Sequence, residues 1–153
     1  MHGSSPTRAS PNRLSARLAA VVAALPLQKG MRVLEIGCGS GAAAREVARI
    51  VGDGHVLGID RSAKAIAQAR ASSKPEIAAG RLSFRHVAIE KFELAPDEAP
   101  YELAFAVRVG ALDGRHPELE GRTLERIAAA LEPGGKLFVG DAGDMQEVRL
   151  RAN

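Results

Sequence analysis

The chain has 153 residues, of which 46% are hydrophobic and 25% charged, and its formal net charge at pH 7 is +3. This length and composition predict one globular domain with a core of its own, and they exclude fibrous and membrane-spanning classes. Cys38 is the only cysteine, which excludes an intramolecular disulfide and a multi-cysteine zinc site. We therefore expect a cytoplasmic protein without a metal centre.

The first 12 residues combine Gly, Ser and Pro without apolar periodicity, and they predict a disordered basic leader over 1–12. All charged side chains before residue 35 are basic, a pattern that can serve nucleic-acid binding. Because no aromatic residues are interleaved with these charges, a solvated tail is favoured over a nucleic-acid interface. We expect residues 13–153 to form a single domain.

Predicted helices and strands alternate along the rest of the chain. The apolar spacing from Leu14 to Leu25 predicts a first helix that ends at Pro26. Strands are predicted over 31–36, 55–59, 82–87, 101–107 and 136–140, and helices over 42–51, 63–71 and 118–131, with a polar connection over 90–100. Strands separated by helices predict an α/β fold with a doubly wound, mostly parallel sheet and helices on both faces.

A glycine-rich turn follows the first strand. Residues 33–41 are Val-Leu-Glu-Ile-Gly-Cys-Gly-Ser-Gly, and the acidic residue Asp60 ends the next strand. Glycines allow the tight turn and a close approach of backbone to ligand, and the helix after them directs its N-terminus to the same place. This pattern predicts a nucleotide-type cofactor site at the carboxyl edge of the sheet. An alternative role for Asp60 is to cap the helix that begins near Ser62.

Two cofactors fit the glycine spacing. Gly37, Gly39 and Ala42 match the G-x-G-x-x-A pattern of dinucleotide sites, where Asp60 would bind an NAD ribose. Glu35 favours the other choice, because a carboxylate at the mouth of the turn would repel a pyrophosphate. It would attract the ammonium and sulfonium groups of S-adenosylmethionine.

Three segments resemble motifs of the class I S-adenosylmethionine-dependent methyltransferases. Residues 33–41 look like the first motif of the family, Leu57-Gly58-Ile59-Asp60 is similar to its second-strand motif, and residues 131–137 resemble its Leu-x-Pro-Gly-Gly turn. The resemblance covers nearly everything from the first helix to the strand over 136–140. It implies a Rossmann-like fold and methyl transfer from S-adenosylmethionine.

The resemblance also implies the roles of individual residues. Glu35 and the glycine turn would hold the methionine part of the cofactor, and Asp60 would accept both ribose hydroxyls. Arg61 stands where the family usually has an apolar residue against the adenine, and Val87 stands where it often has an acidic one. The implied cofactor-binding residues are Glu35, Gly37, Cys38, Gly39, Ser40, Gly41, Asp60, Arg61, Val87, Ala88, Val107 and Arg108.

The methyl acceptor is expected near the loop after the strand over 101–107. Asp113 and His116 in that loop are candidates for a general base, and the sequence assigns the role to neither. The chain lacks the Asn/Asp-Pro-Pro-Tyr/Phe motif of the amino-methylating members and a basic groove with stacking aromatics. A small-molecule acceptor is therefore expected, with no nucleic-acid or membrane partner.

The chain is C-terminally short relative to the family, because only 12 residues follow Asp141. Residues 146–151 alternate weakly and predict at most one more strand. A sheet that ends there has an exposed edge, so we expect a homodimer or a partner chain to cover it. The alternative to an enzyme is a non-catalytic cofactor-binding or interaction module that needs a partner chain.

Overall fold

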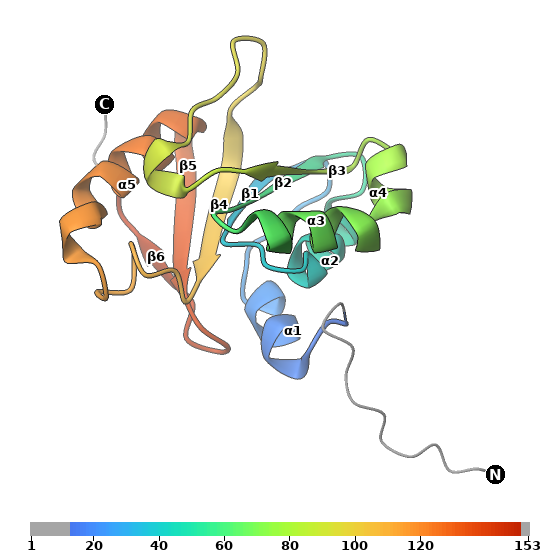
Figure 1. Cartoon of the computed structure of the whole chain (residues 1–153), viewed down its shortest axis with the longest axis horizontal. Helices are drawn as coiled ribbons and strands as arrows, with labels where there is room; N and C mark the ends of the chain where they lie inside the picture. Colours follow the sequence, from blue (N-terminus) through green and yellow to red (C-terminus); the bar gives the residue numbers. More distant parts are fainter. Residues whose placement is uncertain (1–12, 151–153) are drawn as a thin grey trace.

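A computed structural model describes residues 13–150 of the chain (Figure 1). The predicted leader over 1–12 lies outside the described residues. The strands are β1 (Arg32–Ile36), β2 (His55–Asp60), β3 (Leu82–His86), β4 (Tyr101–Val107), β5 (Leu131–Gly140) and β6 (Gln146–Val148). The helices are α1 (Ala16–Ala23), α2 (Ala42–Val51), α3 (Ala63–Ser72), α4 (Lys74–Ala78) and α5 (Pro117–Ala130), with a 3₁₀ turn, η1, at Ile89–Lys91.

The strands form one sheet in the order β3-β2-β1-β4-β5-β6. The pairings from β3 to β5 are parallel, and β6 is antiparallel to β5. Strand order reverses between β1 and β4, which makes the carboxyl ends of these two strands the switch point where ligands of such folds bind. The predicted doubly wound, mostly parallel sheet is confirmed.

Helices cover both faces of this sheet (Figure 1). Successive residues of a strand point to opposite faces. Val33 belongs to a buried cluster with side chains of α1, α2 and α3, whereas Leu34 belongs to a second cluster with η1 and α5. Aliphatic residues fill most of both clusters, and the four aromatic rings among them are Phe84, Phe92, Tyr101 and Phe105. The sheet is therefore buried on both sides, as parallel sheets usually are.

Two elements differ from the prediction. The strand predicted over 136–140 begins at Leu131, which pairs with Tyr101, and the register shifts before Leu103 pairs with Lys136. Residues 132–135 are therefore an irregularity within β5 rather than a turn before it, and Gly134 adopts a φ of +82° there. The short helix α4 was not predicted, and Pro75 occupies its first turn.

The remaining boundaries agree with the prediction to within a few residues. Helix α5 ends at Ala130, one residue earlier than expected, and the weak alternation over 146–151 corresponds to the three-residue strand β6. Between residues 13 and 150, no helix has the length and apolar character needed to cross a membrane.

Candidate functional site

The turn between β1 and α2 adopts a conformation that glycine alone accepts readily. Gly37, Gly39 and Gly41 have φ values of +74°, +54° and +86°. The backbone N–H groups of Gly37 and Cys38 both donate to the carbonyl of Ile59, at 2.8 and 2.9 Å, so the turn is attached to the end of β2. Gly37 is exposed and Gly39 half-buried, so these two present backbone at the switch point of the sheet, whereas Gly41 is buried.

Space also restricts two of these positions. A Cβ at Gly37 would lie 2.9 Å from Val109 Cγ2, and one at Gly41 would lie 2.9 Å from Phe84 Cζ. Gly41 is the N-cap of α2 and has no side chain to cap it, so the first N–H groups of that helix stay directed at the turn.

Asp60 joins this turn to the start of α3. Its Oδ2 accepts from Gly39 N and its Oδ1 accepts from Ser62 N, both at 2.9 Å. Ser62 is the N-cap of α3, because its Oγ accepts from Ala65 N at 3.1 Å, so the alternative of Asp60 as the cap is wrong. Each carboxylate oxygen has a second lone pair, which leaves Asp60 able to accept two further hydrogen bonds.

Glu35 was expected at the mouth of the turn, and the structure places it deeper. Its side chain is buried at 4% exposure, and its Oε1 has no hydrogen-bond partner within residues 13–150. Burial, together with the negative charge of Asp60, raises the pKa of this carboxyl well above its usual range, while Arg45 opposes the shift. A buried carboxylate without a partner is costly, and a cationic group would satisfy it. Glu35 thus fits a ligand with an ammonium group.

Two hollows adjoin at this point and share Gly37, Val107, Arg108 and Arg115 in their walls. The first, of about 340 Å³, is also lined by Asp60, Arg61 and residues 87–90. The second, of about 390 Å³, is lined by Glu35 and residues 37–40, with Arg17 and Leu18 of α1. These volumes suit a small molecule.

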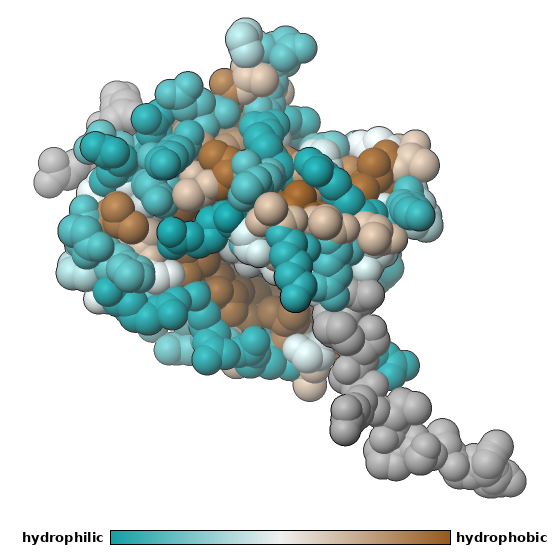
Figure 2. All heavy atoms as spheres, in the orientation of Figure 1, coloured by the Kyte–Doolittle hydropathy of each residue, from teal (hydrophilic) through white to brown (hydrophobic). Residues whose placement is uncertain are grey.

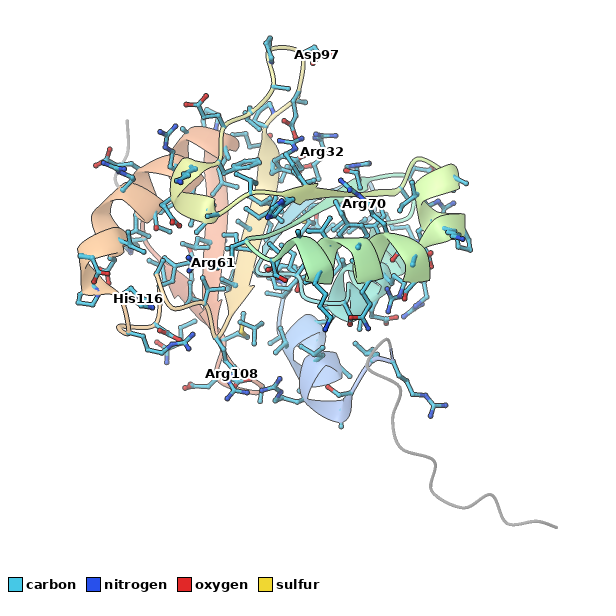
Figure 3. All side chains as sticks on the ribbon, viewed as in Figure 1. Arg32, Arg61, Arg70, Asp97, Arg108 and His116 are labelled. Carbon is cyan, nitrogen blue, oxygen red and sulfur yellow. The ribbon has the colours of Figure 1, made fainter. Side chains whose placement is uncertain are left out.

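The structure brings eleven of the twelve predicted cofactor residues to these walls, and Gly41 is the exception. Figure 2 shows hydrophobic side chains at the bottom of a hollow beside the carboxyl end of β4, with hydrophilic side chains around it. Figure 3 places Arg61, Arg108 and His116 around this region, on three separate segments.

Sequence reasoning missed Arg17 and Arg115. Arg17 comes from α1, which precedes the glycine turn and reaches the site only through its packing on α2. A basic residue within an apolar helical stretch was the signal available for Arg17. Arg115 lies next to the candidate base His116 in the loop after β4, where the acceptor is expected, and it lines both hollows.

The expected acceptor side contains few groups that suit a base or a nucleophile. The guanidinium of Arg115 donates to both oxygens of Asp113, at 2.9 and 3.0 Å, and holds the pKa of that carboxyl below its usual value. His116 lines the first hollow, and its Nδ1 lies 3.5 Å from Glu118 Oε2. Burial raises the pKa of the Cys38 thiol, which makes it a poor nucleophile.

Within the described part of the chain, no three His, Cys, Asp or Glu side chains gather as metal ligands would.

Comparisons with known proteins agree with this geometry. Residues 27–152 match a family described as "Methyltransferase domain". The 27-O-demethylrifamycin SV methyltransferase of Amycolatopsis mediterranei is 31% identical over 129 residues, which are 84% of this chain and 44% of that protein. The chain spans less than half the length of the curated relatives that it matches.

Solved structures of related sequence have the same fold. An S-adenosylmethionine-dependent methyltransferase from Geobacter sulfurreducens, in complex with S-adenosyl-L-homocysteine, is 28% identical with a TM-score of 0.62, over 88% of this chain and 51% of that one. The [4+2]-cyclase SpnF is 29% identical with a TM-score of 0.64, over 80% of this chain and 42% of its own.

Proposed function

Because this chain belongs to the methyltransferase-domain family, we propose that it transfers a methyl group from S-adenosylmethionine to a small-molecule acceptor. One observation carries the proposal: Glu35, a buried carboxylate whose Oε1 lacks a hydrogen-bond partner among the described residues, lies beside a glycine turn and Asp60 at the switch point of the sheet. The relative from Amycolatopsis and the complex with S-adenosyl-L-homocysteine support the same chemistry.

Several of the predicted residues have tasks that fit their surroundings. Glu35 pairs with the ammonium group of the cofactor, and the exposed backbone of Gly37 and Gly39 allows the methionine part to approach closely. Asp60 uses its remaining lone pairs for the two ribose hydroxyls. Arg61 stacks on the adenine, and the backbone of residues 87–90 contacts the edge of the adenine ring. Glu90 takes the role of the acidic residue that the family often has at the position of Val87.

When bound, S-adenosylmethionine supplies an electrophilic methyl carbon together with its own thioether leaving group. The protein therefore has to align an acceptor with the methyl carbon and accept the proton that the acceptor loses. We assign that proton to His116 rather than to Asp113, because Arg115 already occupies both oxygens of Asp113.

A calorimetric titration of the purified chain tests the proposal. We expect saturable binding of S-adenosylmethionine and S-adenosylhomocysteine, and none of NAD at the same concentrations. The substitution Glu35→Gln should weaken both ligands, because it removes the charge that pairs with their ammonium group. Binding of NAD alone, or of none of the three, would refute the assignment of the cofactor.

A second candidate function is cofactor binding without methyl transfer. The similarity to the cyclase SpnF favours it, because that protein has this fold and its name describes a different reaction. The two candidates differ in one product, since methyl transfer must generate S-adenosylhomocysteine. Saturable cofactor binding without that product, across a panel of hydroxyl, amine and carbon acceptors, would favour the second candidate.

Three further parts of the proposal concern the whole protein. A second copy of the chain covers the outer edge of β6, which pairs on one side only among the described residues. Residues 13–153 act as one domain, and the protein works in the cytoplasm. A monomeric mass in sedimentation at high concentration would refute the dimer.

A further inference from the structure

Three arginines gather at the second hollow, and one of them, Arg108, is among the residues that the family resemblance implied for the cofactor and is assigned to the acceptor below. Arg17 comes from α1, Arg108 follows β4 directly, and Arg115 precedes α5. Arg108 and Arg115 line the first hollow as well. The carboxylate partners of the three are Asp113 and Asp141. Three guanidinium groups against two carboxylates make this rim locally basic, whereas the other acidic side chains of the two hollows are Glu35, Asp60 and Glu90.

Arg108 is held in an unusual backbone conformation. Its φ of +56° lies in the left-handed region, which a bulky residue rarely occupies. Hydrogen bonds fix it from both sides, because its N–H donates to the Gly140 carbonyl at 3.3 Å and its carbonyl accepts from Arg115 Nη2 at 2.7 Å. Arg115 is therefore a positioning residue, and it is itself anchored on Asp113. Strain of this kind tends to persist where a side chain has a function.

The guanidinium of Arg108 keeps most of its hydrogen-bonding capacity. Within residues 13–150 its charged contact is with Asp141, where Nε lies 3.6 Å from Oδ2, beyond hydrogen-bond distance. Asp141 is shared, because Arg17 lies at the same distance from the same oxygen. The side chain of Arg108 is 63% exposed. An anion that entered the hollow would thus find a guanidinium with free donors.

Apolar side chains form the rest of the wall next to Arg108. Ile36, Val107, Val109, Ala111 and Leu119 contribute to the first hollow. Figure 2 shows the corresponding pattern, a hydrophobic hollow within a hydrophilic surround. A ligand that satisfies both features has an apolar body and an anionic group.

We propose that the methyl acceptor is a small amphipathic anion whose carboxylate or phosphate group binds to Arg108, while its apolar body lies on the wall beside it. The proposal rests on the proposed methyl transfer and adds the class of acceptor to it. A guanidinium offers two parallel N–H donors, which match both oxyanions. Arg115 acts through Arg108, because it holds the backbone that directs this side chain.

The test uses the full chain saturated with S-adenosylhomocysteine and a pair of probes of equal size. We expect 4-hydroxyphenylacetate to bind at least about tenfold more tightly than its uncharged carboxamide, since one charge-assisted contact is of that order. Phenyl phosphate is the second anionic probe, and it shows which of the two oxyanions is preferred. Calorimetry measures all three affinities.

Arg108→Gly is the informative variant, because glycine accepts the left-handed conformation and so keeps the backbone. It should abolish the preference for acid over amide, and Arg108→Lys should keep part of it. Arg122→Gln, at an exposed position of α5 away from both hollows, is the matched control and should retain the preference in full. Thermal melting confirms that each variant is folded.

Three results with the acid and amide probes would overturn the inference. They are equal affinity for acid and amide, no binding of either, and an Arg108→Gly variant that retains the preference. A tenfold loss of S-adenosylhomocysteine binding in Arg108→Gly would also overturn it, because Arg108 would then belong to the cofactor site. Failure of the parent chain to bind S-adenosylhomocysteine is seen before any probe is added, and it would refute the proposed function itself.

Discussion

The substitution Asp60→Ala should weaken both the fold and the cofactor site, because this carboxylate serves both. In the structure its two oxygens accept from Gly39 N and Ser62 N, each at 2.9 Å, and they join the glycine turn to the start of α3. The proposed ribose contacts use the lone pairs that remain. Two separate measurements should therefore change together.

The size of each change can be worked out from these contacts. A hydrogen bond of this kind contributes about 1 kcal/mol net, so the loss of two costs about 2 kcal/mol of unfolding free energy. For a chain of this size that corresponds to a melting temperature lower by about 4–8 °C. Removal of the Asp60 charge also relieves its repulsion of Glu35, which makes this figure an upper bound. The affinity for S-adenosylhomocysteine should fall at least about tenfold, because the ribose hydroxyls lose their acceptors.

Differential scanning calorimetry gives the first quantity, and isothermal titration with S-adenosylhomocysteine gives the second. Asp53→Ala is the matched control, because Asp53 is exposed in the turn after α2 and should change neither. A lower melting temperature with unchanged affinity would show that Asp60 only supports the turn. No change in either quantity would refute the hydrogen bonds themselves.

Three other substitutions probe the site and the core. Glu35→Gln should raise the unfolding free energy at pH 8 and leave it unchanged below pH 4.5. The pKa of Glu35 is raised in the folded chain, so the parent loses stability as the pH rises above 4.5, the usual value of a glutamate. Urea titrations at both pH values measure this, and an equal effect at both would contradict it. Gly58→Ala would place a Cβ 2.9 Å from both the Phe84 ring and the Cys38 Cβ and should cost about 1–3 kcal/mol in the same assay, whereas a neutral effect would show that both neighbours can move away. Tyr101→Phe removes an O–H that donates to Glu98 at 2.5 Å and should cost about 1 kcal/mol in thermal unfolding, which an unchanged melting temperature would refute.

The order of the elements could be predicted from the sequence because their signals are local. Strand β1 is a run of buried residues from Val33 to Ile36, and such runs are typical of parallel strands covered on both faces. The glycines after it predict a turn with positive φ values, and the structure has such a turn. The helix predicted over 63–71 corresponds to α3, which begins directly after its N-cap Ser62.

What the sequence could not supply depends on contacts between distant segments. The start of β5 at Leu131 depends on its pairing with Tyr101 of β4, and the Pro-Gly-Gly sequence gave no sign of a strand there. Arg17 reaches the hollow because α1 packs on α2, a relation that helical spacing does not specify. The depth of Glu35 was likewise misjudged, since burial is a property of the assembled sheet.

Glu35 and Asp60 together show why this site favours a cation. The backbone N–H groups of Gly39 and Ser62 satisfy Asp60, whereas Glu35 lies nearby with a buried oxygen that no described residue satisfies. Burial and the negative charge of Asp60 both oppose the ionisation of Glu35. A ligand with an ammonium group next to Glu35 would reverse this balance, because it pairs with the ionised carboxylate and offsets the repulsion from Asp60. A ligand with a pyrophosphate at the same place would add further negative charge beside both acids. Glu35, which burial and Asp60 make costly to ionise, therefore selects a ligand that carries a positive charge at this place.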